Sequence, residues 1–318
     1  MLWTICILFI LTFLGFQILY DSSSVMMSVI TGIELWKNNI VPSMFPFFML
    51  SEFFIYFGFV EFISEIFKPI MNKFFKMRGI CSFIFIMSIF SGCPGNAKYT
   101  SELLNSDDID YKEATKILLF SQFSSPLFIL GSVANVFLQN KEVGFYILFF
   151  HYIGNLFVGI CFRNYNPRYE KSSSSLSRAF SKTIEKRRKN EQSFGMFFTS
   201  AVQKAMQTLL TILGVIITFL VLTTIIDHNI NIPTLYQSLL NGCLEMTQGL
   251  KYISLLSIPL KLKVTFTVLL LSFGGLSVHM QMFSILSSKV RYFPFLTARI
   301  LHAFFSSFMA YIFFDFFF

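Results

Sequence analysis

The sequence Ser91-Gly92-Cys93-Pro94-Gly95-Asn96-Ala97-Lys98 interrupts a hydrophobic run that extends from Ile80 to Phe90. Pro94 removes a backbone hydrogen-bond donor, and the glycines allow turns that other residues avoid, so a helix should break here. The apolar run has only about a dozen residues, whereas a full membrane crossing needs roughly twenty. Broken backbone at membrane depth is tolerated only beside protein or a water-filled cavity, and such breaks often form the substrate site of transporters. The stretch therefore predicts the tip of a re-entrant hairpin that faces a pore.

The composition is that of an integral membrane protein. Of the 318 residues, 54% are hydrophobic, 13% are charged and 44 are phenylalanine. The net charge of +8 lies mainly in two short segments and is a topology signal, so nucleic acid is not an expected partner. The five cysteines show no paired spacing, which argues against a disulfide framework or a metal site. No nucleophile elbow, His-x-x-x-His motif or phosphate-binding loop is present, so we expect neither an enzyme nor a cofactor.

Six apolar segments are long enough to predict transmembrane helices in an all-α polytopic fold. Leu2 to Tyr20 is expected to be retained because no A-x-A-like cleavage site follows it; a signal peptide is the alternative. The next piece, through Trp36 and Lys37, predicts an amphipathic helix at the membrane interface. The other five segments are Val41 to Phe59, Lys116 to Leu138, Val143 to Phe162, Gln207 to Ile226 and Phe293 to Phe316.

A second short apolar run, Leu262 to Phe273, ends in Gly274-Gly275 much as the first ends in Gly92-Cys93. An amphipathic stretch precedes each run and a span follows it, which predicts an internal repeat. Three crossings separate the two copies, and an odd number inverts the second, so two opposed re-entrant hairpins should meet near mid-membrane. The expected units are an N-terminal transmembrane helix (1–23), a first repeat with a linker span (24–162), a basic linker (163–193) and a second, inverted repeat (194–318).

The linker from Arg163 to Ser193 carries nine Lys or Arg residues against three Glu. Basic residues in loops of this length favour the cytoplasmic side, so we expect the linker there. A re-entrant first hairpin also keeps the basic segment Lys68 to Arg78 on that side, whereas a full crossing would separate the two basic segments.

Four basic side chains lie in or beside membrane segments: Lys98, His279, Arg299 and His302. An ionisable group at bilayer depth costs about 2.5–3.5 kcal/mol even on a lenient scale, so each needs a partner or a function. We expect this group to receive an anionic carboxylate. The residues expected to add hydrogen bonds are Ser91, Asn96, Ser124, Ser125, Ser277 and Gln281.

Structural alternatives exist for these residues. In the alternative interpretation, Lys98 and Arg299 extend to the membrane interface or pair with Glu52 and Glu102. The serines before Pro126 would then only kink a helix, and the polar side chains at the two breaks would only join helices.

Several stretches together resemble the YlbJ-type sporulation integral membrane proteins of the nucleoside-recognition (Gate) domain superfamily. The matching stretches are Gly32-x-x-x-Trp36, VPSMFPFFMLSE ending at Glu52, SGCPGNAKYTSELL from Ser91, FSQFSSPLFILG from Phe120, HYIGNLFVG from His151, FGGLSVHMQMFSIL from Phe273 and ARILHAFFS from Ala298. The resemblance implies a role in endospore formation, in the mother cell, at the outer forespore membrane. It also implies transport of dipicolinic acid, a small aromatic dianion that suits basic and amide groups.

A non-transporting scaffold for spore assembly that uses the basic linker, and a carrier of nucleosides or other small solutes, are the alternative functions. The expected partners are a small anionic solute, the lipid bilayer, and either a second copy of the chain or other sporulation membrane proteins.

Overall fold

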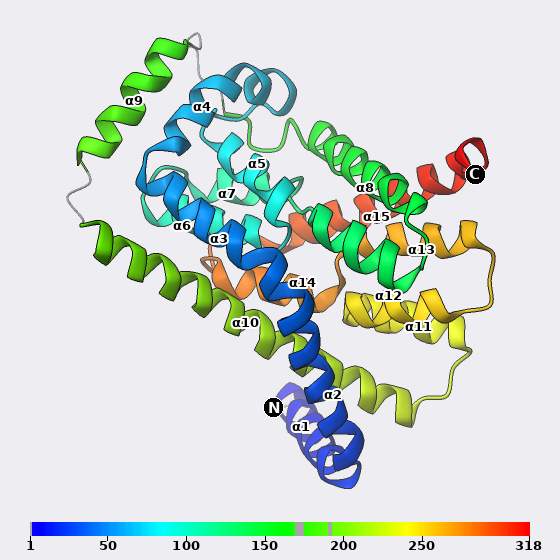
Figure 1. Cartoon of the computed structure of the whole chain (residues 1–318). Helices are drawn as coiled ribbons and strands as arrows, with labels where there is room; N and C mark the ends of the chain where they lie inside the picture. The colour runs from blue at the N-terminus through cyan, green and yellow to red at the C-terminus, as the bar shows by residue number, and fades with distance from the viewer. Residues whose placement is uncertain (1, 169–174, 190–192) are drawn as a thin grey trace.

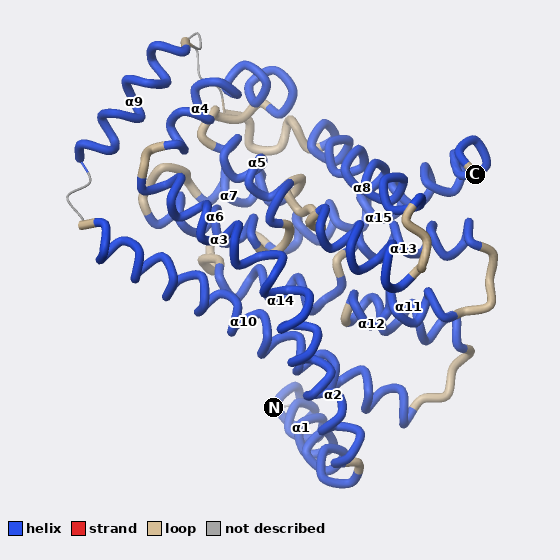
Figure 2. The backbone as a smooth tube through the Cα atoms, in the orientation of Figure 1, coloured by secondary structure: helices blue, strands red, loops and turns tan. Residues whose placement is uncertain are grey.

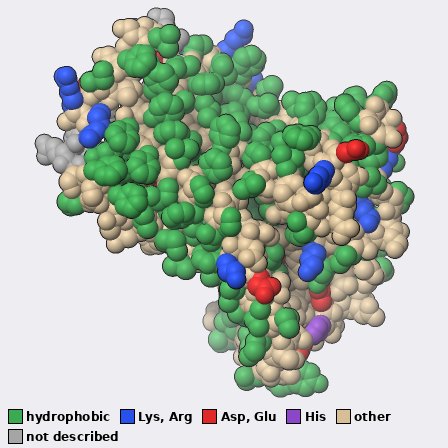
Figure 3. Space-filling model, in the orientation of Figure 1, with side chains coloured by type: hydrophobic (Ala, Val, Ile, Leu, Met, Phe, Trp, Pro, Cys, Tyr) green, Lys and Arg blue, Asp and Glu red, His purple; other side chains and the backbone are tan. Residues whose placement is uncertain are grey.

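The computed structural model describes residues 2–168, 175–189 and 193–318. All regular structure in these residues is helical, as predicted (Figure 2). Five helical stretches are long and apolar enough to cross a membrane: Ser22–Tyr56, Glu142–Cys161, Phe194–Asn229, Leu260–Ile285 and Tyr292–Phe317. Shorter apolar helices add to them, and hydrophobic side chains cover most of the face shown in Figure 3. The membrane assignment follows from this pattern.

The N-terminal region contains α1 (Leu2–Tyr20), α2 (Ser22–Leu35), the π-helical segment η1 (Trp36–Ile40) and α3 (Val41–Tyr56). The separate interfacial helix before a span at Val41 is a wrong prediction, because Ser22–Tyr56 is one helical stretch of 35 residues. Pro42 does not break it, because the π-helical turn η1 lies directly before it, with the Val41 amide bonded to the Trp36 carbonyl five residues back, and this turn accommodates the proline. The Trp36 indole donates a hydrogen bond of 2.7 Å to the carbonyl of Leu209 instead of marking an interface.

The middle of the chain holds the first break. The elements are α4 (Phe59–Ile70), η2 (Met71–Phe75), α5 (Cys81–Ser91), α6 (Gly95–Asn105), α7 (Tyr111–Leu118), η3 (Phe128–Phe137) and α8 (Glu142–Cys161). The predicted helix break after Ser91 is confirmed, and α5 packs against α6. The predicted span Lys116 to Leu138 is broken at 119–125, because Pro126 disfavours helical backbone in the residue before it.

The C-terminal half contains α9 (Leu176–Lys189), α10 (Phe194–Asn229), α11 (Thr234–Leu244), α12 (Met246–Leu255), α13 (Leu260–Phe273), α14 (Gly275–Ile285) and α15 (Tyr292–Phe317). The long helix α10 is about 54 Å in length and packs along α2 and α3 (Figure 1). Helix α15 packs against both α8 and α13.

The sequence predicts a second hairpin, with two helices packed side by side, at Gly274-Gly275, but the structure has no such hairpin at this position. Helices α13 and α14 meet there but do not pack along each other, and α14 leads away from α13 (Figure 1). The two glycines have φ angles of +91° and +70°, which redirect the chain without folding it back. The packed pair is α11–α12, and a Cβ added at Gly249 would lie 2.1 Å from the Gly242 Cα.

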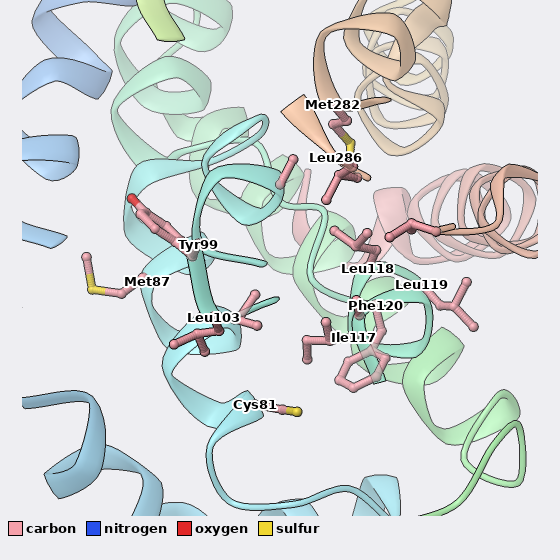
Figure 4. Close-up of a cluster of buried hydrophobic side chains, with 14 of the residues drawn as sticks. Cys81, Met87, Tyr99, Leu103, Ile117, Leu118, Leu119, Phe120, Met282 and Leu286 are labelled. Carbon is pink, nitrogen blue, oxygen red and sulfur yellow. The ribbon is translucent and has the colours of Figure 1, made fainter. Parts of the chain in front are cut away.

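Both halves of the chain contribute side chains to each of two large hydrophobic clusters. Figure 4 shows Cys81, Tyr99 and Ile117, from α5, α6 and α7, in the same buried cluster as Met282 and Leu286 from the region of α14. A second cluster joins η3 and α8 to α12, α13 and α15. This shared packing fixes the four breaks in the helices relative to one another.

Candidate functional site

Four interruptions in the helices meet at one narrow cavity of about 60 Å³. They are the α5–α6 turn, the segment 119–125, the α11–α12 junction at Glu245 and the α13–α14 junction at Gly274. Residues from these breaks that line the cavity are Cys93, Gln122, Ser124, Ser125, Glu245, Met246, Thr247 and Gly274, with Leu271, Val278 and Gln281 beside them. Ser43 of α3 and Ile212 of α10 help to close it. The volume corresponds to about four water molecules.

The first two breaks are tied together by backbone contacts. The Cys93 amide donates a hydrogen bond of 2.7 Å to the carbonyl of Phe123. Gly92 has a φ of +77°, and a Cβ at that position would lie 2.7 Å from the Ser125 amide nitrogen. The chain therefore needs glycine at this position, both for its conformation and for the close approach.

Four helical segments begin at these breaks, at Gly95, Pro126, Met246 and Gly275. The first amides of a helix have no partner within the helix and carry partial positive charge. The Ser125 hydroxyl accepts the Phe128 amide, and the Glu245 carboxylate accepts the Gln248 amide at 2.8 Å. The Gln122 side chain is buried, and its Oε1 has no hydrogen-bond partner among the residues that the structure describes.

A buried basic network lies behind the segment 119–125. The Arg299 guanidinium is fully buried and donates to the Leu119 carbonyl, to Asn155 Oδ1 at 3.1 Å and to His302 Nδ1 at 3.0 Å. Asn155 in turn donates to the Gln122 carbonyl at 2.8 Å. Within the described residues no carboxylate pairs with Arg299. The guanidinium is thus one residue removed from the cavity and is not compensated by an opposite charge.

The hydrogen bonds of the two network histidines define their proton positions. Because His302 Nδ1 accepts from Arg299, its Nε2 carries the hydrogen that is donated to the His151 carbonyl at 2.8 Å. His151 Nε2 accepts the Ser124 amide at 2.9 Å, so its Nδ1 donates to Ser272 at 3.0 Å. Both imidazoles are therefore neutral, and Arg299 holds the positive charge of the network.

Lys98 lies outside the cavity lining. It forms ion pairs with Glu52, at 2.5 Å, and with Glu102, and Glu52 also pairs with Lys204 at 3.2 Å. The alternative interpretation of Lys98, a pairing with these two acids, is the arrangement that the structure shows. Arg299, in contrast, neither reaches an interface nor pairs with them.

The remaining predicted residues divide into two groups. Ser124, Ser125 and Gln281 line the cavity, and Ser277 donates to Glu245 over 3.5 Å. The others do not line it. Ser91 bonds back to the Met87 carbonyl, and His279 lies between the Phe273 carbonyl and the Tyr292 hydroxyl. The Asn96 side chain is buried and has no hydrogen-bond partner within the described ranges of the chain. His279 thus satisfies a carbonyl that the end of α13 leaves free.

Sequence reasoning missed Glu245, Gln122, His151 and Asn155 as parts of this site. Glu245 lies inside what the sequence presents as a single amphipathic helix, with no proline or glycine at the turn. The one available signal was an ionisable residue in a segment that becomes buried. No group of three or more His, Cys, Asp or Glu side chains suited to a metal ion occurs in the described part of the chain.

Comparisons with known proteins agree with this architecture. Residues 39–140 match the Gate family, described as nucleoside recognition. The chain is 33% identical over 297 residues to the sporulation integral membrane protein YlbJ of Bacillus subtilis (strain 168), covering 85% of this chain and 73% of that protein. No solved structure matches the chain. An integral membrane protein with a Gate domain and this degree of identity over most of its length belongs to the family of the sporulation integral membrane protein YlbJ.

Proposed function

We propose that this protein is a sporulation transporter that moves dipicolinate, a small dianionic carboxylate, from the mother cell across the outer forespore membrane. Family membership supports the sporulation role, and the meeting of broken helices at one cavity supports transport. Dipicolinate is the substrate that the family resemblance implies, and the buried Arg299 behind the cavity wall supports an anionic substrate.

The observation that carries the proposal is the fully buried Arg299 guanidinium without a carboxylate partner in the described residues. A buried charge costs several kcal/mol unless it is compensated, so such a group is retained where a ligand supplies the opposite charge. Arg299 contacts the cavity wall through Asn155 and Gln122. A carboxylate in the cavity would provide the missing counter-charge through a short, low-dielectric path.

The cavity wall offers the hydrogen-bond donors that a carboxylate needs. Side chains of Gln122, Ser124, Ser125 and Gln281 face it, and several helices begin at its wall. Helix starts favour anions through their free amides and the helix dipole. In this proposal these groups bind substrate directly, while Arg299 and His302 act from behind the wall.

The architecture also suits alternating access. In the proposed repeat, the re-entrant hairpin α5–α6, the broken span α7–η3 and α8 correspond to the hairpin α11–α12, the broken span α13–α14 and α15. Three crossings, α2–α3, α7–η3 and α8, separate the start of α2 from the start of α10, so the second copy is inverted in this proposal. Room for only about four waters marks a closed form, and an aromatic dianion enters when the two repeats move apart.

The test is the dipicolinate content of spores from a strain that lacks this protein, measured together with dipicolinate in the mother cells. Export by this chain predicts depleted spores and mother cells that accumulate dipicolinate. Normal spore dipicolinate would eliminate the substrate assignment.

Further experiments distinguish dipicolinate transport from the two alternative functions, a membrane scaffold and a nucleoside carrier. Helix α9 exposes Leu176, Phe180 and Ile184 beside basic residues, which favours a scaffold as the second candidate. Replacing residues 170–192 with a flexible Gly/Ser linker of equal length should preserve transport but abolish a scaffold function. Competition by nucleosides for dipicolinate binding would instead indicate a nucleoside carrier.

A further inference from the structure

Glu245 is a buried carboxylate at the wall of the cavity. Its exposed fraction is 1%, and it lies at the junction of α11 and α12. One carboxylate oxygen accepts the Gln248 amide at 2.8 Å, and the other faces the Ser277 hydroxyl at 3.5 Å. Within the described residues no Lys, Arg or His pairs with it. The Thr247 amide and hydroxyl also donate to it, and the carboxylate caps the start of α12. All of these donors are neutral, so part of the cost of burying the charge stays uncompensated.

Further oxygen atoms lie at the same junction. The carbonyls of Gly242 and Leu244 belong to the last turn of α11, where a helix leaves carbonyls without internal partners. A Cβ built on Gly275 would lie 3.1 Å from the Gly242 oxygen and 3.4 Å from the Leu244 oxygen. These carbonyls therefore face the start of α14, which also carries Ser277. The junction combines a carboxylate, a hydroxyl and helix-end carbonyls, the oxygen ligands that hard cations prefer.

We propose that Glu245 and the oxygens around it bind a small monovalent cation, either a proton or Na⁺, that is coupled to movement of the anionic substrate. The coupling rests on the proposed transport function, whereas the cation site itself does not. Binding neutralises the carboxylate and removes the like-charge repulsion that a dianion would meet in the cavity. Cation and substrate can thereby be bound at the same time.

The neighbouring charged groups are occupied elsewhere. Elements packed against α11 and α12 are α10, α13, α14 and η3. The relevant contacts are Asp227 with Asn241, His228 with Asp21, Lys204 with Glu52, Lys261 with Asp315, Lys263 with the Ser254 carbonyl, and His279 with Phe273 and Tyr292. The pair itself adds Tyr236, Cys243, Lys251 and Tyr252, and the last of these contacts Gln248. In the part of the chain that the structure describes, none of these groups contacts the Glu245 carboxylate.

The experiment measures thermal unfolding of the full-length protein in detergent, without substrate, in two titrations. One replaces choline by Na⁺ at constant ionic strength, and the other lowers the pH from about 8 to about 5. Glu245→Gln is the test variant because its amide oxygen can still accept the Gln248 amide. Asp110→Asn is the matched control, since Asp110 caps α7 outside the cavity.

A Na⁺ site predicts that saturating Na⁺ raises the unfolding temperature of the native protein by about 5 °C, with no rise in Glu245→Gln. A proton site predicts no Na⁺ effect; instead Glu245→Gln is the more stable protein at about pH 8 and the difference disappears near pH 5. Asp110→Asn should respond like the native protein in both titrations. If Glu245→Gln does not fold, Ser277→Ala retains the carboxylate and should weaken the apparent Na⁺ or proton affinity several-fold.

Identical responses of the native protein and Glu245→Gln in both titrations would overturn the cation site. The same preparations are then titrated with dipicolinate alone. A cation response without dipicolinate binding would remove the proposed substrate and leave the cation site in place. Dipicolinate binding without any Glu245-dependent cation response would remove only the cation site.

Discussion

Replacing Arg299 with Met removes the guanidinium while retaining most of the side-chain volume. The substitution leaves Leu119 O, Asn155 Oδ1 and His302 Nδ1 without their donor. Each buried acceptor costs about 1–3 kcal/mol when it loses its partner. The variant also removes the desolvation penalty of an uncompensated buried charge, which is several kcal/mol. The two effects oppose each other, so we expect the protein to insert and fold with a loss of at most about 4 kcal/mol.

The effect of Arg299→Met on substrate binding should be larger than its effect on folding. One carboxylate about 7 Å from the guanidinium, at an effective dielectric constant near 20, gains about 2.4 kcal/mol. Its loss weakens dipicolinate binding roughly 60-fold. Arg299→Lys keeps the charge and should lose less than about tenfold. The assay is equilibrium binding of labelled dipicolinate to detergent-purified protein.

The control for Arg299→Met is Arg163→Met, which removes the same charge from a half-buried residue away from the cavity, whose guanidinium donates to the Lys73 carbonyl. Dipicolinate affinity should not change in that variant. A folded Arg299→Met protein that binds dipicolinate within twofold of the native protein would refute the electrostatic role of Arg299.

Three further predictions concern the packing around the site. Lys98→Met removes the cation that Glu52 and Glu102 share, and it should lower the free energy of unfolding by about 3–5 kcal/mol. Unfolding in detergent measures this, and unchanged stability would contradict the buried ion-pair network. Gly249→Leu should force α11 and α12 apart and lower the unfolding temperature. Gly15→Ala should not lower it, because a Cβ at Gly15 would have nothing within 4 Å. Equal effects of the two variants would argue against close packing of α11 and α12. Glu65→Gln removes the carboxylate that pairs with Lys68, Arg178 and Lys182, so trypsin should cleave the α9 region faster; unchanged cleavage would show that α9 does not depend on Glu65.

Local chemistry predicted the breaks in the helices but not always their shape. Proline and glycine act on their immediate backbone, so the breaks after Ser91, before Pro126 and at Gly274 could be found from sequence. Whether a break folds a helix back or only redirects it depends on packing against distant helices. The hairpin predicted at Gly274 was therefore misplaced, and the packed pair at Glu245 was missed because no local breaker marks that turn.

For the candidate site, too, the sequence could predict single residues but not how distant helices pack around them. Arg299 and His302 are three residues apart in the last predicted span and so share a helix face, and the structure brings them together at 3.0 Å. The sequence could not show that Asn155 and Gln122 stand between Arg299 and the cavity, because that depends on how α8 and α15 pack. Nor could it decide between a substrate and Glu52 as the partner of Lys98, since the two residues are far apart in sequence and meet only through tertiary packing.

The buried charges of the described residues suggest why an anion and a cation would bind together. Glu52, Glu65, Lys68, Lys98 and Glu113 all have opposite charges beside them. Lys116 has no such partner but donates to the carbonyls of Lys76 and Arg163. Arg299 and Glu245 are the remaining two buried charges; Glu245 lines the cavity, and Arg299 lies behind its wall, linked to it through Asn155 and Gln122. A dianion compensates Arg299 but repels Glu245, whereas a cation at Glu245 removes that repulsion. Each ligand must therefore raise the affinity for the other by the same factor, and this reciprocity is the thermodynamic basis of coupled transport.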